Sequence, residues 1–269
     1  MQPFNKNLSV PDVNIYSPIF NFMKKAIIAV VGIYFLVAMF ACNGNGNIFS
    51  QKIVGTGEIV TDKRTVGNFT GVSLEFSGDV MLKQGNETTV DVVAQANIAQ
   101  EVETVVIDNI LHIRFKNRNG YNYSYKKLTV YVVTPNIENI HLTGSGDLTA
   151  LNDIKSDNLQ VALRGSGGIK LKNIECTTLD AHVQGSGNIS MDGGNAQSAS
   201  YAVTGSGDIG AENIKARSVN VKTTGSGNIS CYAIESIDAK CTGSGDITYS
   251  GHPAQTIVKS TGSGSIQAK

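Results

Sequence analysis

The sequence predicts an all-β fold, a parallel β-helix (β-solenoid) with coils of about 20 residues and irregular N-terminal coils. Three observations predict it. A Gly-Ser-Gly phrase returns at a nearly fixed interval, apolar residues occupy every second position before it, and an aliphatic residue follows two positions after its second glycine. Each coil of a solenoid buries its apolar face only by stacking on its neighbours, so a period of this length indicates stacked coils.

The phrase marks one corner of each coil. Its seven copies are separated by 21, 20, 20, 20, 18 and 19 residues and begin at Gly144, Gly165, Gly185, Gly205, Gly225, Gly243 and Gly262. Glycine allows a positive φ at a sharp corner, and the Asp or Asn that often follows can bond local backbone groups. We therefore predict that the phrase is a turn.

Alternating apolar residues predict the strands. The residues six, four and two positions before a phrase, such as Leu179, Ala181 and Val183, point to one side of an extended chain. A further inward isoleucine recurs at Ile154, Ile174, Ile214 and Ile234. Each coil then holds about three short strands, stacked on the next coil at roughly 4.8 Å. Tyr201 is the largest inward residue, and Ala181 one coil earlier leaves room for its ring.

The residue after each phrase decides between a simple turn and a calcium site. In chain order it is Asp147, Gly168, Asn188, Asp208, Asn228, Asp246 and Ser265, so no two of these carboxylates occupy neighbouring coils. Calcium takes six to eight oxygen ligands, usually with several carboxylates. We therefore predict no metal and no cofactor. We assign no catalytic residue, because the four histidines are scattered in the sequence and no catalytic triad is apparent.

The first 54 residues carry the features of an export leader. We assign residues 1–22 to a mis-assigned upstream start, because Met23, two lysines and a short apolar stretch are typical of a signal peptide over 23–41. Cys42 follows Met-Phe-Ala, which resembles the bacterial lipobox, and is the predicted site of lipid attachment. Residues 42–54 are then a flexible tether. An ordinary signal peptide with a chance cysteine is the alternative.

Residues 55–143 keep the strand chemistry without the strict period. We predict strands over 71–76, 88–94, 110–115 and 127–133, a turn at Asp108-Asn109 and a short helix near 97–103. The segment FSGDV at 76–80 is a degenerate copy of the phrase. This predicts irregular coils over 55–143 that continue into regular repeats over 144–269, since terminal repeats are often atypical.

The segment GVSLEFSGDVMLKQG at 71–85, the stacked TGSGDI and GSGNI coils and the lipoprotein-like leader together resemble the bacterial head GIN domain family of proposed auto-transporter adhesins. The resemblance covers residues 55–269. It implies a right-handed parallel β-helix and an extracytoplasmic location. No catalytic residue of that family is established that could be transferred to this chain.

Three lysines in consecutive coils are the candidate binding residues. They lie three positions before a phrase, in an outward column that consists of His141, Ala162, His182, Ala202, Lys222, Lys240 and Lys259. Lysines stacked at about 4.8 Å repel one another unless acids or an anionic partner offset them, and only Asp238 is near. We predict that this possible anionic-ligand strip contacts acidic surface polysaccharide or a surface protein. The alternative is a solvated lysine face that keeps an exposed sheet soluble.

Two further expectations concern the C-terminal coils. Cys231 and Cys241 take inward positions, so we predict core thiols, with a disulfide between them as the alternative. The last coil has no capping helix in the sequence and would expose strand edges. We therefore expect a homo-oligomer that forms through the C-terminal coil.

Composition and pattern together favour a binding protein. The formal net charge is +0, which gives no argument for a nucleic-acid partner. We expect an extracytoplasmic protein that is lipid-anchored to the bacterial outer membrane and acts as a non-enzymatic adhesin-like binding or structural module. The alternative is a polysaccharide-active enzyme, a lyase or hydrolase, because a β-helix does not fix the function.

Overall fold

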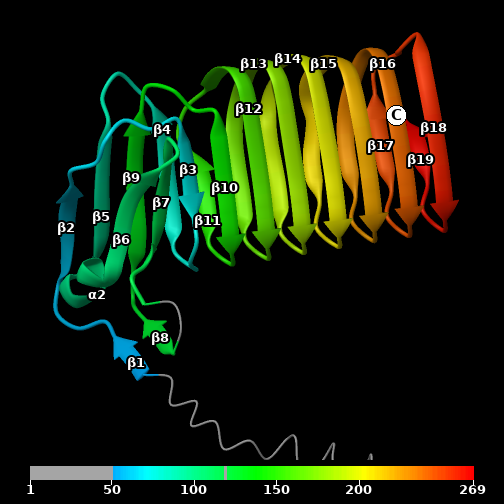
Figure 1. Cartoon of the computed structure of the whole chain (residues 1–269). Helices are drawn as coiled ribbons and strands as arrows, with labels where there is room; N and C mark the ends of the chain where they lie inside the picture. Colours follow the sequence, from blue (N-terminus) through cyan, green and yellow to red (C-terminus); the bar gives the residue numbers. More distant parts are fainter. Residues whose placement is uncertain (1–50, 118–119) are drawn as a thin grey trace, which may run out of the picture. The chain divides into compact units, whose positions relative to one another are not determined.

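The computed structural model describes residues 51–117 and 120–269, which belong to one compact unit, Ser50–Lys269. The predicted upstream start, signal peptide and Cys42 lie outside the described residues. The unit is nearly all-β and contains stacked parallel coils, a β-solenoid of about six turns, so the predicted fold class is confirmed. Figure 1 shows the strands of successive coils side by side. No helix in the described part of the chain is long and apolar enough to cross a membrane.

The regular coils are built from strands that bend around the solenoid. Each strand pairs in parallel with the equivalent residues of the next coil, as Leu159 pairs with Leu179 and Leu179 with Ala199. The strands are β10 (Asn139–Gly144), β11 (Asp147–Ala150), β12 (Ile154–Gly165), β13 (Gly168–Gly185), β14 (Asn188–Gly205), β15 (Ile209–Gly225), β16 (Ile229–Gly243), β17 (Ile247–Ser250), β18 (Gln255–Gly262) and β19 (Ile266–Ala268). Repeat positions therefore stand in columns, as the sequence period predicts.

The Gly-Ser-Gly phrase forms the corner of each coil. Gly205, the first glycine of its copy, has a φ of +125°, a conformation that favours glycine. A Cβ on the second glycine, Gly207, would lie 2.0 Å from the carbonyl oxygen of Gly187 in the previous coil. The first glycine is required by backbone conformation and the second by the close approach of two chains, so the predicted turn is confirmed.

The Asp or Asn after the phrase joins successive coils. Asn188 Oδ1 accepts the backbone N–H of Asp208 at 2.9 Å, and Asp208 Oδ1 accepts the N–H of Asn228 at 2.8 Å. The contact continues from Asn228 to Asp246 at 2.9 Å and from Asp246 to Ser265 at 2.8 Å. We call this series the Asx ladder. Its side chains satisfy backbone donors that the sharp corner leaves without strand partners.

The interior is filled by the predicted inward columns. Tyr201 is 1% exposed and lies between Ala181 and Val221 of the adjacent coils. Its hydroxyl has no hydrogen-bond partner among the described residues. The aliphatic residue after the phrase is buried in every copy except Ile266 in the last coil, which is partly exposed. Each buried side chain of this size stabilises the fold by roughly 1.5–3 kcal/mol.

The prediction that Ile234 points inward is wrong. Ile234 is 45% exposed, whereas its neighbour Ala233 is buried. The register between β15 and β16 shifts here, so that Ala216 pairs with Ala233. A shift of one residue turns a side chain to the opposite face of a strand, which is why Ile234 lies on the surface. The other three isoleucines of that set are buried as predicted: Ile154, Ile174 and Ile214.

The two inward cysteines are buried free thiols. Cys241 Sγ donates a hydrogen bond to the carbonyl oxygen of Gly245 at 2.9 Å, and Thr223 Oγ1 donates to Gly227 in the same way one coil earlier. Burial raises the pKa of the Cys231 thiol to about 12. The prediction of core thiols is confirmed, and the alternative disulfide between Cys231 and Cys241 does not form in this structure.

The N-terminal part is irregular because antiparallel strand pairs stand in place of complete coils. Its elements are β1 (Gln51–Val54), β2 (Ile59–Arg64), β3 (Gly71–Leu74), β4 (Asp79–Gln84), β5 (Thr89–Gln95), α2 (Ala96–Glu101), β6 (Val102–Ile107), β7 (Ile110–Phe115), β8 (Tyr121–Ser124) and β9 (Leu128–Thr134). β5 pairs antiparallel with β2 and β9, and β6 pairs antiparallel with β7. The predicted turn at Asp108-Asn109, with φ values of +51° and +62°, reverses the chain between β6 and β7.

One early coil does stack on the regular ones. β3 pairs in parallel with β10, and β4 pairs in parallel with β11, which places Asp79 beside Asp147. The degenerate phrase at 76–80 is therefore a corner. Among the seven residues after the regular phrases no carboxylates are adjacent, but the column extends one coil further, where Asp79 and Asp147 are neighbours. Burial raises the pKa of Asp79, and the charge of Asp147 raises it further.

The N-terminal end of the described unit differs from expectation, and its C-terminal end is exposed. Residues 51–54, which we expected in the flexible tether, form β1, which pairs in parallel with β8. Ile53 of β1 packs against the hydrophobic core, and this apolar contact stabilises the position of the strand. At the other end β18 is exposed along its whole length, including Ile257 at 63% and Val258 at 49%. Self-association through the last coil stays a prediction.

Candidate functional site

The predicted lysines lie on the sheet face formed by β10, β12 to β16 and β18. The pairing register places seven residues in one line across these strands, which we call the histidine–lysine column: His141, Ala162, His182, Ala202, Lys222, Lys240 and Lys259. In β10 and β12 to β16 these positions alternate with buried residues, so their side chains project from the sheet, and Lys259 lies on the exposed strand β18. The structure thus brings together all seven positions that the repeat places in the column.

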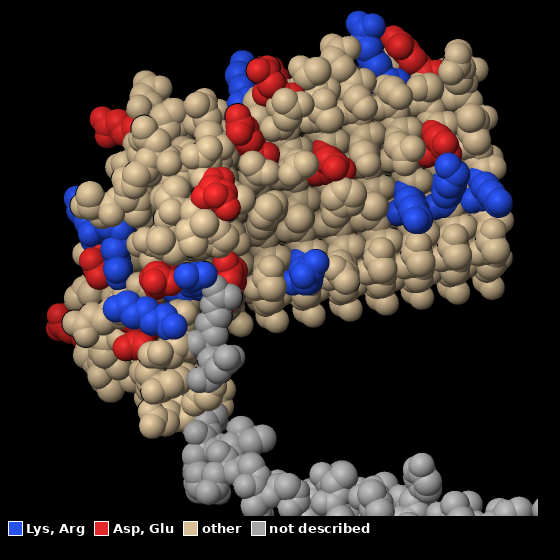
Figure 2. Space-filling model, viewed as in Figure 1, with Lys and Arg blue, Asp and Glu red and all other residues tan. Residues whose placement is uncertain are grey.

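The C-terminal half of the column is cationic. Lys222, Lys240 and Lys259 pair on adjacent strands, and Figure 2 shows basic side chains gathered over the last coils. Lys240 Nζ lies 3.1 Å from Asp238 Oδ2. Within the part of the chain that the structure describes, no ion pair holds Lys222 or Lys259. Two of the three lysine charges therefore have no ion-pair partner among the described residues.

The N-terminal half of the column is rich in histidine. β7 continues the same sheet beyond β3, and it adds His112 to the line that holds His141 and His182. His112 Nδ1 lies 2.8 Å from Glu75 Oε1, and His182 Nε2 lies 2.8 Å from Asp180 Oδ1. The four histidines are scattered in the sequence, yet three of them lie in one column. His112 escapes the sequence pattern because it belongs to the irregular part of the chain.

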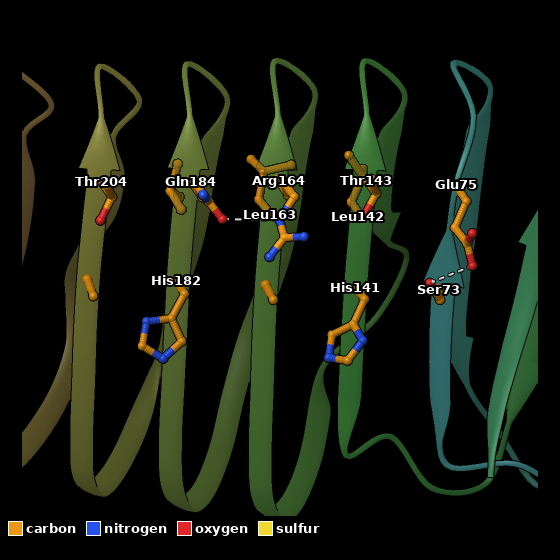
Figure 3. A pocket seen from close by; sticks show the side chains of 13 residues that line it. Ser73, Glu75, His141, Leu142, Thr143, Leu163, Arg164, His182, Gln184 and Thr204 are labelled. Atoms are coloured by element: carbon orange, nitrogen blue, oxygen red, sulfur yellow. Dashed lines mark hydrogen bonds between the residues drawn. The ribbon is translucent and has the colours of Figure 1, made fainter. Parts of the chain in front are cut away.

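A shallow depression of about 630 Å³ lies over the histidine half of the column. His141 and His182 line it together with Ala162 and Ala202, and Arg164 lies beside them on the same face (Figure 3). The hollow exists because alanine side chains alternate with the longer imidazoles along the column. Its lining combines apolar methyl groups with imidazole, guanidinium and carboxylate groups, and the carboxylate belongs to Glu75. Such a mixture is typical of sites that orient a ligand.

Glu75, whose Oε1 lies 2.8 Å from His112 Nδ1, also lines the depression, and the positive charge there comes from Arg164. Its Nε donates a hydrogen bond to Gln184 Oε1 at 3.1 Å, and its guanidinium is charged at every physiological pH. Burial lowers the pKa of His141, and nearby His112 lowers it further, so His141 is a neutral ring at pH 7. The column pattern misses Arg164, because it stands directly before a phrase. An alignment of the residues directly before each phrase would have found Arg164.

The site has the chemistry of a binding surface. Cations in a line beside an open hollow can hold anionic groups through charge and charge-assisted hydrogen bonds. Within residues 51–117 and 120–269, no group of three or more His, Cys, Asp or Glu side chains is placed to hold a metal ion. The fold defines a class of protein, a β-solenoid, and one of its sheets carries this polar face.

The chain belongs to the family described as "Putative auto-transporter adhesin, head GIN domain", whose model matches residues 68–253. The match spans the early coil and most of the regular coils, and it confirms the resemblance that the repeated phrase indicates. The comparison with curated proteins gave no match.

Three solved structures are similar to this chain. One is described as a putative adhesin from Bacteroides fragilis and shares 27% identity, with a TM-score of 0.77, over 81% of this chain and 100% of that chain. A putative lipid binding protein from Parabacteroides distasonis shares 26% identity, with a TM-score of 0.70, over 81% and 100%. A putative adhesin from Parabacteroides merdae has the same fold at 22% identity, with a TM-score of 0.67, over 81% and 99%. The family and the Bacteroides fragilis neighbour support an adhesin-like role at the cell surface.

Proposed function

We propose that the protein is a lipid-anchored, extracytoplasmic, non-enzymatic adhesin-like module that binds an acidic polysaccharide along the histidine–lysine column. The stacking of Lys222, Lys240 and Lys259 on adjacent strands carries the proposal. Like charges about 4.8 Å apart repel one another, and a bound polyanion offsets that repulsion. A linear polymer suits the surface, because the charges follow one line from coil to coil.

The binding test compares residues 43–269 with a variant that carries Lys222→Gln, Lys240→Gln and Lys259→Gln, on immobilised acidic and neutral polysaccharides. We expect wild-type retention on acidic polymers and a loss of about tenfold or more in the variant. Three lost charge contacts of about 0.5–1 kcal/mol each amount to this change. Retention should also fall with added salt, because exposed charges are screened.

The matched control removes the same number of charges outside the column, with Lys170→Gln, Lys172→Gln and Lys215→Gln. These residues are exposed on the coils but belong to other columns. We expect the control variant to bind like the wild type. Equal losses in the two triple variants would contradict the proposed face, and release of cleaved polysaccharide by the wild type would place the protein among enzymes.

Membrane attachment is the second part of the proposal, and its support comes from the leader. Cys42 follows a lipobox-like segment and the short apolar stretch of 23–41. Diacylation anchors a protein stably where one acyl chain does not. Cys42→Ser should abolish incorporation of labelled palmitate and move the protein from the outer-membrane fraction to the soluble fraction. A variant that keeps both the label and the membrane association would contradict lipid attachment at Cys42.

A further inference from the structure

The depression contains a gap of defined width above Ala162. Ala162 pairs with His141 on one side and with His182 on the other, so its methyl group lies between two imidazoles. The two histidine strands are separated by two strand spacings, roughly 10 Å. Figure 3 shows both rings projecting from the same side of the sheet, on either side of the strand that carries Arg164. The gap therefore has two ring walls and an apolar floor.

Arg164 supplies the polar group of this gap. It lies two residues after Ala162 on β12, so both side chains project from the same face. The bond from Nε to Gln184 Oε1 orients the guanidinium and leaves its terminal nitrogens as donors. Among the described residues no ion pair holds Arg164. An arginine in this state is suited to a carboxylate, which matches the planar guanidinium in a two-pronged contact.

We propose that the gap between His141 and His182 is a subsite for the carboxylate-bearing unit of an acidic polysaccharide, with Arg164 bound to the carboxylate. This rests on the proposed function and names the substrate class, a polymer of uronic acid units. The sugar ring lies on the Ala162 methyl between the two imidazoles. Its hydroxyls bond the ring nitrogens of His141 and Nδ1 of His182, because His182 Nε2 already contacts Asp180 Oδ1. The site thus combines an apolar floor, which accepts the C–H face of a sugar, with donors at its edge.

The histidine–lysine column also indicates the direction in which the bound polysaccharide extends from the subsite. Ala202 repeats the arrangement of Ala162, because it pairs with His182 on one side and with Lys222 on the other. A chain that leaves the Ala162 subsite toward the C-terminal coils crosses this second gap and then meets Lys240 and Lys259. Arg164 is the specific contact in this arrangement, and the lysines are the screened, less specific ones.

The test uses a short ligand that fills only the subsite. The full chain, purified in detergent, is titrated by calorimetry with a tetramer of galacturonate, a neutral tetramer of galactose and a sulfated galactose tetramer. We expect the galacturonate tetramer to bind the wild type. Arg164→Gln should weaken it about ten- to a hundredfold, the range for a lost hydrogen bond to a charged group.

Two variants separate the geometry of the subsite from its charge. Arg164→Lys keeps the charge but loses the two-pronged contact, and we expect it to recover only a small part of the affinity. Ala162→Leu fills the gap from an outward position and should abolish binding of the tetramer. Arg217→Gln is the matched control, because Arg217 is an exposed arginine outside the column that pairs with Glu235 at 3.2 Å, and it should bind like the wild type.

The outcomes distinguish the subsite from the proposed function. Wild-type affinity for the tetramer in Arg164→Gln overturns the subsite. A loss in the triple lysine variant with Arg164→Gln unaffected also overturns it, while it supports polymer binding along the column. Preference for the sulfated tetramer overturns the carboxylate assignment. Failure of the wild type to bind both the tetramer and long acidic polymers overturns the subsite and the proposed function together.

Discussion

The regular coils and the N-terminal part build the same sheets by different means. In the coils, β12 to β16 pair in parallel with the equivalent residues one coil away, and the phrase sets every corner. In the N-terminal part, β2, β5 and β9 pair antiparallel, and a tight turn joins β6 to β7. The difference teaches that a repeat determines register wherever it is present, whereas a part without it depends on contacts between distant segments.

The column of residues that follow the phrase runs from Asp79 in the N-terminal part to Ser265 in the last coil, and its side chains are in different environments at the two ends. At its N-terminal end Asp79 and Asp147 are adjacent, and burial together with the Asp147 charge raises the pKa of Asp79. At its C-terminal end Asp246 accepts bonds from the backbone and hydroxyl of Ser265, which lower its pKa. The same position is thus under repulsion where the coil is irregular and is bonded where the Asx ladder is complete.

The largest loss of stability should come from a cavity in the core of a regular coil. Ile209→Ala removes a fully buried side chain and should lower the free energy of unfolding by about 2–5 kcal/mol, because the packed interior cannot close around the cavity. Ile234→Ala is the matched control, since Ile234 recurs in the same repeat but is exposed, and it should change stability by less than about 0.5 kcal/mol. Denaturant unfolding measures both, and equal losses would contradict the register shift at Ala233.

A glycine pair tests whether the corner is tighter in the coils than in the N-terminal part. Gly207→Ala places a Cβ against the carbonyl oxygen of Gly187 and should cost about 1–3 kcal/mol, the usual cost of overpacking. Gly67→Ala is the control, because nothing lies within 4 Å of a Cβ there, and reduced backbone freedom of the unfolded chain should leave it neutral or slightly stabilised. The melting temperature measures both. A stable Gly207→Ala variant would show that successive corners do not approach so closely.

Removal of one oxygen should make the coils more stable. The Tyr201 hydroxyl is buried and has no hydrogen-bond partner in the described structure. Tyr201→Phe keeps the ring and removes the unsatisfied group, so it should stabilise the fold by about 1 kcal/mol. The midpoint of denaturant unfolding should rise accordingly. A lower midpoint would mean that the hydroxyl has a partner, such as a buried water.

The smallest effects should come from pH, with opposite signs at the two ends of one column. The ionised form of Asp79 opposes folding, so Asp79→Asn should raise the melting temperature at pH 7, and this advantage should shrink as pH falls through the raised pKa. The ionised form of Asp246 favours folding above the ordinary value of 3.8, and this contribution is lost as pH falls through the lowered pKa.

Asp246→Asn should therefore lower the melting temperature slightly at pH 7 and leave it unchanged below the lowered pKa. The Asn side chain still accepts the Ser265 N–H, so the variant removes only the charge. Melting curves of both single variants between pH 2 and pH 7 check the prediction. Shifts of the same sign in Asp79→Asn and Asp246→Asn would contradict the contrast between the two ends.

The candidate site was predictable where it follows the repeat. His141, His182 and the three lysines share one position in the period, and the structure places them in one column. Arg164 stands in the next outward position of the same strand and could have been found by the same alignment. Glu75 could also have been placed, because it stands directly before the degenerate phrase at 76–80, as Arg164 stands before its own phrase. His112 could not, because no period links residues 110–115 to the coils.

The sequence by itself determined the coil, its corners, the columns and the outward cations, because a period of about twenty residues forces equivalent side chains to stack. Only the tertiary structure decided the N-terminal part. There β7 and β9 lie on one side of the early coil, and β10, which follows them in the chain, lies on the other. Distant segments compete to pair with the same sheet edges, and the outcome depends on which edge each segment buries. This competition leaves no periodic signal in the sequence. The same competition turned Ile234 outward, because the shortened coil kept its strand pairing at the expense of the local apolar pattern.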